Sequence, residues 1–293
     1  MLRGLPPIDP VTGIFSEATH ILGRNPLEYD DDLALSSTSQ VHIAIFIAEI
    51  AVLRLLADQG ATPDAVAGSS LGAFAAAVAC GSLTFEQALP IVRLRGELMQ
   101  EAYPEAYGMA VILGLNERRV AAIVERSTTT QAPVFVTNVN APDQVLVSGS
   151  DAGMTVVLRR ALEAGARKAK RLRISVPSHC SLLTAISERL GSALSTVHMS
   201  TPEVPYVSSR GRPLRDADSI RNDLSTSIKY PVRWYDATSV LFELGVRLFL
   251  ELPPGQTLTD LAVASFPSVR SIAFENYRLD SVVNLIKRQK LAT

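Results

Sequence analysis

The 293-residue sequence contains few of the residue types that build covalent or metal-bound scaffolds. Its two cysteines, Cys80 and Cys180, do not indicate a disulfide framework and fit a reducing cytoplasm. No C-x-x-C or H-E-x-x-H spacing occurs, so we expect no metal site. The formal net charge is only -1, which gives no electrostatic reason to expect nucleic acid or an anionic membrane as a partner. The first residues also lack the charged and apolar regions of a signal peptide, and we expect a cytoplasmic protein.

Long hydrophobic runs are equally scarce. The most apolar stretch, residues 43–56, contains Glu49 and Arg54 and is too short and too charged to span a bilayer, so we expect a buried helix there. The composition is otherwise that of a globular protein, with 47% hydrophobic and 19% charged residues. This length predicts one large domain, or one domain with an inserted subdomain.

Short apolar strands alternate with helices in the first and last parts of the chain. We expect helices at residues 15–23, 39–59, 71–80, 85–102, 181–196, 215–228 and 231–244, and strands at 65–67, 205–208 and 247–251. This alternation predicts an α/β fold with a mostly parallel sheet.

The middle of the chain has a different pattern. We expect strands at residues 108–115, 134–140, 144–148 and 168–176, and helices at 117–126 and 151–164. The order strand, helix, strand, strand, helix, strand is the ferredoxin-like arrangement. We therefore expect an α/β core made of residues 1–105 and 176–293, with a ferredoxin-like subdomain inserted at 106–175.

The strongest local signal for chemistry is Gly68-Ser69-Ser70-Leu71-Gly72, which follows an apolar strand and opens a helix. A nucleophile elbow requires this context, and it makes the core hydrolase-like. Ser70 would lie at a helix N-terminus, where developing negative charge is favoured, and the N–H of Leu71 could donate to an oxyanion. The alternative is a turn of small residues that has no chemical role.

A nucleophilic serine needs a base, and the sequence has four histidines. His179 stands just after an apolar strand, where its side chain could reach a site at the strand ends; the alternative is a structural turn histidine. His42 lies in the apolar helix and is expected to be a core histidine. His20 and His198 lie in polar segments and are expected to be solvated.

Arg95 lies within an apolar helix, two positions after Arg93, so the two arginines cannot share a helix face. A guanidinium directed inward would bind a carboxylate through two hydrogen bonds. Spacing alone also allows a solvated or salt-bridged arginine. Cys180, next to His179, is expected to be a small buried residue and not a thiol nucleophile.

Together these residues resemble the malonyl-CoA:acyl carrier protein transacylase family along nearly the whole chain. GSSLG matches the family's GHSLG elbow, RLRGELMQEA its R-G-x-x-M-Q segment, and SVPSHCSLL its histidine segment. The resemblance implies that Ser70 is the nucleophile, that His179 is the base and that Arg95 binds the malonyl carboxylate. The matching segment VNAPDQVLVSG implies that Asn140 reaches the site. The segments YPVRW and ELPPGQTL match as well, and the resemblance implies that a backbone carbonyl just before YPVRW, at about Ser227, orients the histidine.

Within this family the chain is most similar to the epsilon subunit of malonate decarboxylase, in stretches such as SSRGRPLRDADSIRNDL and GVRLFLELPPG. This branch implies transfer of malonyl from malonyl-CoA to the coenzyme-A-like prosthetic thiol of an acyl carrier protein. Other subunits of malonate decarboxylase are then further partners, and no permanently bound cofactor is expected.

The sequence departs from the family at several points. The family opens with a strand and an F-P-G-Q-G segment that supplies a second oxyanion donor, whereas this sequence begins after that segment. Loss of such a donor costs roughly 10²–10³ in rate. Ser69 and Ala73 stand where the family usually has histidine and often has glutamate, which bears on specificity. The alternatives are a malonyltransferase of fatty-acid synthesis, an α/β-hydrolase-type esterase, or an inactive, N-terminally truncated docking subunit.

Overall fold

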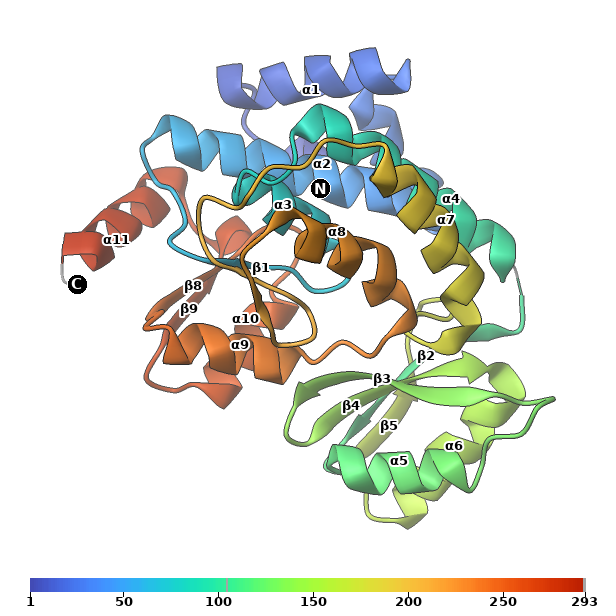
Figure 1. Ribbon diagram of the computed structural model, residues 1–293. Helices are drawn as coiled ribbons and strands as arrows, with labels where there is room; N and C mark the ends of the chain where they lie inside the picture. Colours follow the sequence, from blue (N-terminus) through green and yellow to red (C-terminus); the bar gives the residue numbers. More distant parts are fainter. Residues whose placement is uncertain (104, 292–293) are drawn as a thin grey trace.

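The computed structural model describes residues 1–103 and 105–291 (Figure 1). Its α-helices are α1 Asp9–Leu22, α2 Thr38–Asp58, α3 Gly72–Ala79, α4 Phe85–Ala102, α5 Glu117–Glu125, α6 Asp151–Glu163, α7 Thr184–Ser195, α8 Ala217–Thr226, α9 Trp234–Glu243, α10 Thr257–Ser265 and α11 Leu279–Leu291. Its strands are β1 Val66–Ala67, β2 Tyr107–Leu113, β3 Val134–Ala141, β4 Gln144–Ser150, β5 Lys168–Arg171, β6 Tyr206–Val207, β7 Pro213–Leu214, β8 Leu248–Glu251 and β9 Arg270–Ala273.

Capping side chains, a proline and a glycine determine where several helices begin and end. Thr84 and Gln87 form a capping box at the start of α4, as the sequence predicts. The side chain of Ser37 accepts a hydrogen bond from the N–H of Gln40 at the start of α2. Helix α1 ends at Gly23, which adopts the left-handed conformation that glycine tolerates. This helix begins at Asp9, six residues before the predicted start, because Pro10 occupies its first turn.

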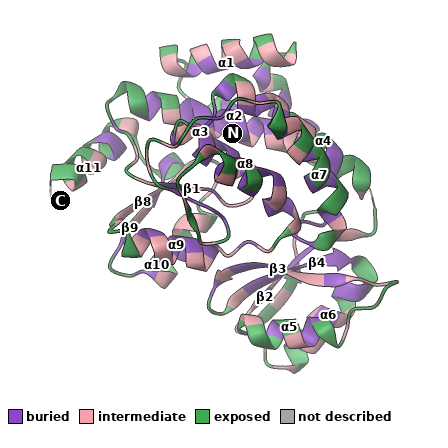
Figure 2. Ribbon diagram, in the orientation of Figure 1, coloured by how far each residue is buried: buried purple, intermediate pink, exposed green. Residues whose placement is uncertain are grey.

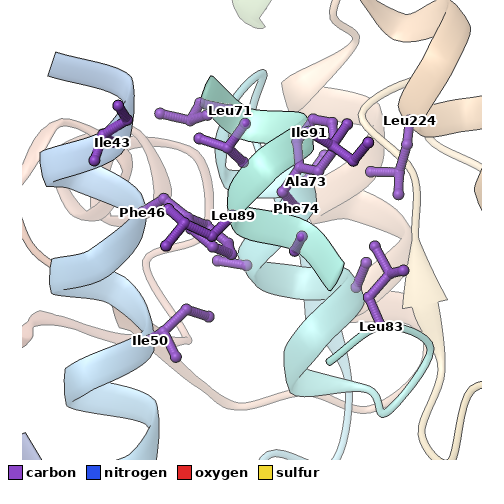
Figure 3. Close-up of a cluster of buried hydrophobic side chains, with 14 of the residues drawn as sticks. Ile43, Phe46, Ile50, Leu71, Ala73, Phe74, Leu83, Leu89, Ile91 and Leu224 are labelled. Carbon is purple, nitrogen blue, oxygen red and sulfur yellow. The ribbon is translucent and has the colours of Figure 1, made fainter. Parts of the chain in front are cut away.

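Helix α2 is the centre of the helical layer and packs against α1, α3 and α4. Its length and composition alone would allow it to cross a membrane, but it is largely buried within the protein. Phe46 stacks on Phe85 with ring centroids 5.8 Å apart. Figure 3 shows Phe46 beside Leu89 of α4, within a cluster that extends to Phe74 of α3. The prediction of a buried helix is therefore confirmed.

Residues 107–171 form a separate layered unit, which lies at the lower right in Figure 1. Its strands pair antiparallel in the order β3-β4-β2-β5. Helices α5 and α6 cover one face of this sheet, and their outer sides are largely exposed (Figure 2). The core between the helices and the sheet is apolar. The predicted order of strands and helices is present. The last strand is shorter than predicted, because its register with β2 ends at Arg171, apart from one bond from the Leu172 N–H to Met109, and residues 173–175 are exposed.

The rest of the chain does not form the single, mostly parallel sheet that the sequence predicts. β1 pairs parallel with β6, and β6 pairs antiparallel with β7. The parallel pair β8–β9 forms a second, separate sheet. Within the described chain β1 and β8 each have one strand neighbour, and no strand joins the two pairs into one sheet. The fold is a mixed α/β fold, and a hydrolase-like sheet is not confirmed.

A cavity of about 1510 Å³ lies beside the two small sheets. Consecutive residues of the β1 and β8 segments line it, and α2, α3 and α10 also contribute to its walls. Among the described residues of α2, Glu49 is the one carboxylate that lines the cavity. Its Oε2 atom is buried and has no hydrogen-bond partner among the described residues. Burial raises the pKa of Glu49 to about 8.

Candidate active site

Ser70 lies at the turn between β1 and α3, in a strained backbone conformation. Its φ is 55°, which is in the left-handed region that non-glycine residues rarely adopt. A Cβ atom at Gly68 would lie 2.2 Å from the backbone of Gly72 and Ala73, so only glycine allows the strand and helix to approach this closely. These features place a half-buried hydroxyl at the tip of a sharp turn, which is the geometry of a nucleophile elbow.

The N–H of Leu71 lies directly after this turn and makes no hydrogen bond within the described part of the chain, whereas the N–H groups of Gly72 and Ala73 bond back to Ser69 and Ser70. A free backbone donor next to the hydroxyl is available to a developing oxyanion.

His179 lies against Ser70, although 109 positions separate them in the sequence. Its Nε2 atom is 2.8 Å from Ser70 Oγ, and its Nδ1 atom is 2.9 Å from the carbonyl oxygen of Ser227. A carbonyl oxygen can only accept, so Nδ1 carries the proton and Nε2 presents its lone pair to the hydroxyl. Burial, together with the nearby charge of Arg95, lowers the pKa of His179 to about 4, although the hydrogen bond to the Ser227 carbonyl acts in the opposite direction. The imidazole is therefore neutral at pH 7, as a general base must be.

Arg95, on α4, is the third side chain of this site. Its side chain is buried, and its Nη2 atom donates a 3.0 Å hydrogen bond to Ser70 Oγ. No described carboxylate pairs with it, whereas the neighbouring Arg93 is exposed and pairs with Glu97. Burial lowers the pKa of Arg95 to about 10, which still leaves it charged at pH 7. A buried cation without an anion is costly, and it indicates a place for an anionic ligand group.

The structure does not bring every predicted residue to this point. Asn140 is half-buried on β3, and its side chain makes no hydrogen bond to Ser70, Arg95 or His179 among the described contacts. His20 and His198 are exposed, as predicted. Burial raises the pKa of Cys180 to about 11, so this thiol is not activated.

Two residues of this region have no signal in the sequence. Ser148 of β4 donates through its hydroxyl to the carbonyl of Gly108 and accepts from the N–H of Ser178, both at 3.0 Å. It therefore fixes the backbone next to His179 from the four-stranded sheet. His42, predicted to be an ordinary core histidine, contacts the guanidinium of Arg95.

The arrangement supports a specific chemistry. A neutral base can take the proton of Ser70, a backbone N–H can bind the oxyanion, and a guanidinium without a carboxylate partner can bind an anionic group of the substrate. Among the described residues no group of histidine, cysteine, aspartate and glutamate side chains could hold a metal ion.

Comparison with known proteins matches residues 15–290 to the acyl transferase domain family. The malonyl CoA-acyl carrier protein transacylase of Bacillus subtilis (strain 168) is 33% identical over 265 residues, which cover 89% of this chain and 84% of the relative. The protein of the same name from Escherichia coli (strain K12) is 34% identical over 258 residues, covering 84% of this chain and 82% of the relative.

Solved structures are similar over still more of the chain. The acyl-carrier-protein S-malonyltransferase of Burkholderia pseudomallei 1710b superposes with a TM-score of 0.91 at 30% identity, covering 97% of this chain and 94% of that one. A malonyl-transacylase in complex with a type II PKS acyl-carrier protein superposes with a TM-score of 0.89 at 31% identity, covering 94% of this chain and 91% of that one.

Proposed function

Because this chain belongs to the acyl transferase domain family, we propose that it transfers a malonyl group from malonyl-CoA to the thiol of an acyl carrier protein through a malonyl–Ser70 intermediate. The observation that carries the proposal is the position of Ser70 Oγ, which lies 2.8 Å from the base His179 and 3.0 Å from the unpaired cation Arg95. A base activates the hydroxyl, and the cation selects an acyl group that ends in a carboxylate.

The first half-reaction acylates the serine. Arg95 binds the malonyl carboxylate and so places the thioester carbonyl against Ser70 Oγ. His179 Nε2 takes the hydroxyl proton as Oγ attacks, and the N–H of Leu71 stabilises the oxyanion. The C–S bond then breaks, and His179 returns its proton to the leaving thiolate of coenzyme A.

The second half-reaction reverses these steps with a different thiol. The prosthetic thiol of the carrier protein gives its proton to His179 and attacks the malonyl–serine ester. The carbonyl of Ser227 keeps the imidazole in the required tautomer throughout, because it accepts from Nδ1. Ping-pong kinetics follow from the covalent intermediate, and the cycle needs no resident cofactor.

The subdomain at 106–175 has a supporting role in this proposal. Ser148 joins its sheet to the segment that carries His179. Asn140, on β3 of the same sheet, contributes to the site once the substrate is bound.

The finer proposal is that the chain is the epsilon subunit of malonate decarboxylase, a cytoplasmic protein that charges the carrier of that complex. The stretches SSRGRPLRDADSIRNDL and GVRLFLELPPG support it. The test is a comparison of two acceptors, a carrier with a coenzyme-A-like prosthetic group and the phosphopantetheine carrier of fatty-acid synthesis. Faster transfer to the second carrier would contradict the subunit assignment and leave the malonyltransferase intact.

The main experiment is intact mass spectrometry after mixing with malonyl-CoA. The wild-type protein is expected to gain one malonyl group, and Ser70→Ala to gain none. Ser69→Ala is the matched control and should still react. Adduct formation on Ser70→Ala would refute the nucleophile, and release of free malonate without a carrier would favour an esterase. A protein that binds the carrier but gains no adduct would be a docking subunit.

A further inference from the structure

His42 and Arg95 are in contact although 53 positions separate them. The Nη1 atom of Arg95 lies 3.2 Å from His42 Nε2 and 3.4 Å from His42 Nδ1. Nη1 lies within hydrogen-bond distance of both ring nitrogens, so the ring nitrogen that carries no proton can accept from the guanidinium.

The opposite side of the same guanidinium points to the nucleophile. Nη2 donates to Ser70 Oγ, while Nη1 is held by His42. The two contacts together fix the plane of the guanidinium, which a bidentate hydrogen bond to a carboxylate requires. A guanidinium without the second contact could rotate about its long side chain.

The contact depends on an unusually close approach of two helices. A Cβ atom at Gly96 would lie 2.7 Å from Ser39 Cα and 3.1 Å from His42 Nδ1. Gly96 thus lets the first turns of α2 lie directly on α4, next to Arg95. Gln100, one turn further along α4, accepts hydrogen bonds from the Ser37 hydroxyl and the Ser39 N–H and holds the start of α2 in place.

The protonation state of His42 makes it suited to this position. Burial lowers the pKa of His42 well below its ordinary value, and the charge of Arg95 lowers it further. A neutral ring can hold the guanidinium without cancelling its charge. A glutamate in the same place would also orient Arg95, but it would occupy the cation that the substrate needs.

We propose that His42 is a positioning residue that sets the selectivity of the site for acyl groups ending in a carboxylate, by holding the Nη1 side of Arg95 so that the Nη2 side faces the substrate. The inference rests on the proposed function, since it assigns the anionic ligand of Arg95 to the malonyl carboxylate. Within the described part of the chain His42 makes no hydrogen bond to Ser70 or His179, so it acts through Arg95 alone.

The test compares His42→Leu and His42→Gln, with His20→Leu and His20→Gln as exposed controls. Acylation of Ser70 is measured by single-turnover mass spectrometry over a range of malonyl-CoA and acetyl-CoA concentrations. His42→Leu should raise the KM for malonyl-CoA and lower malonyl kcat/KM about tenfold, the scale of one hydrogen bond to a charged group. Acetyl kcat/KM should change by less than about twofold, because acetyl has no carboxylate to place.

His42→Gln retains a polar acceptor and should keep malonyl kcat/KM within about threefold of wild type. Equal losses for malonyl and acetyl in His42→Leu would overturn the inference, because they indicate a packing role. Loss of malonyl selectivity in His42→Gln as large as in His42→Leu would overturn it as well. A wild-type protein that forms no malonyl adduct would remove the proposed function and this inference together, whereas normal wild-type transfer with unchanged selectivity in His42→Leu would remove this inference alone.

Discussion

The guanidinium of Arg95 donates a 3.0 Å hydrogen bond to the hydroxyl oxygen of Ser70, which also bonds to His179. The nucleophile is therefore held between a neutral base and a cation. A positive charge at this distance stabilises negative charge on Oγ as its proton leaves. Arg95 thus has two separable effects, one on the serine and one on the carboxylate of the substrate.

Arg95→Ala separates these effects. Malonyl transfer should fall about a hundredfold, because two charge-assisted hydrogen bonds to the carboxylate are lost. Acetyl transfer should fall much less, because a methyl group gains nothing from a guanidinium and loses only its effect on Ser70 Oγ. Arg95→Lys should restore malonyl transfer only in part, because an ammonium cannot form the planar fork. Both substrates are assayed on each variant; a common loss factor would mean that Arg95 acts on Ser70 only.

His179→Ala should form the malonyl–serine adduct at least about a hundredfold more slowly than wild type, in line with the usual contribution of general base catalysis. Rapid-quench mass spectrometry measures the rate. His20→Ala is the matched control, because His20 is exposed, and it should react normally. Equal rates in the two variants would exclude His179 as the base.

The pH profile should report the depressed pKa of His179. The base is active in its neutral form, which predominates above its folded pKa of about 4. Malonyl kcat/KM should therefore be flat between about pH 6 and 8 and decline only as the pH falls toward 4. A midpoint at about 6.5, the ordinary pKa of histidine, would contradict this environment for the ring. Circular dichroism at each pH separates titration from unfolding.

Ser148→Ala tests the link between the four-stranded sheet and the segment of His179. The change removes the acceptor of the Ser178 N–H and one donor to the Gly108 carbonyl, both in a buried position. We expect a loss of about 1–3 kcal/mol in the free energy of unfolding, measured by urea titration, together with slower acylation. Ser195→Ala, at an exposed helix end, is the control and should be close to wild type. Unchanged acylation in Ser148→Ala would show that the link does not position His179.

Glu49→Gln tests the buried carboxyl group in the cavity. Burial raises the pKa of Glu49 to about 8, so the folded protein keeps a proton that the unfolded chain releases above about pH 4.3. Wild-type stability should therefore fall as the pH rises through this window, and the amide should remove that loss. The gain in Tm from Glu49→Gln should be larger at pH 8 than at pH 5. The exposed Glu243→Gln is the control and should show no such difference. If Glu49→Gln also shows no difference between the two pH values, the Glu49 carboxyl group is in contact with water.

Local signals in the sequence were enough for the elbow and for most helices. Gly68 and Gly72 flank Ser70 in a pattern that requires a sharp turn, and Thr84 with Gln87 marks the start of α4. Helical spacing also separates Arg95 from Arg93, and the structure has the first buried and the second exposed.

Contacts between distant segments could not be predicted in this way. His42 and Ser148 look like ordinary residues of an apolar helix and a strand, and their importance depends on partners 53 and 30 positions away. The run 173–176 has the composition of a strand, yet β5 ends at Arg171 and only the Leu172 N–H still bonds to β2. The division into one sheet that contains β1 and another that contains β8 likewise depends on which strands pair, and composition does not specify strand pairing.

Ser70 and His179 share a further property, since both hold a left-handed backbone, with φ of 55° and 56°. Such conformations cost about 1–3 kcal/mol each and persist only while the surrounding structure enforces them. The two strained turns belong to different segments, so loosening either one separates the pair. On heating, enzymatic activity should consequently disappear several degrees before the helices melt, and the protein would inactivate reversibly in a temperature range where its circular dichroism is still that of the folded state.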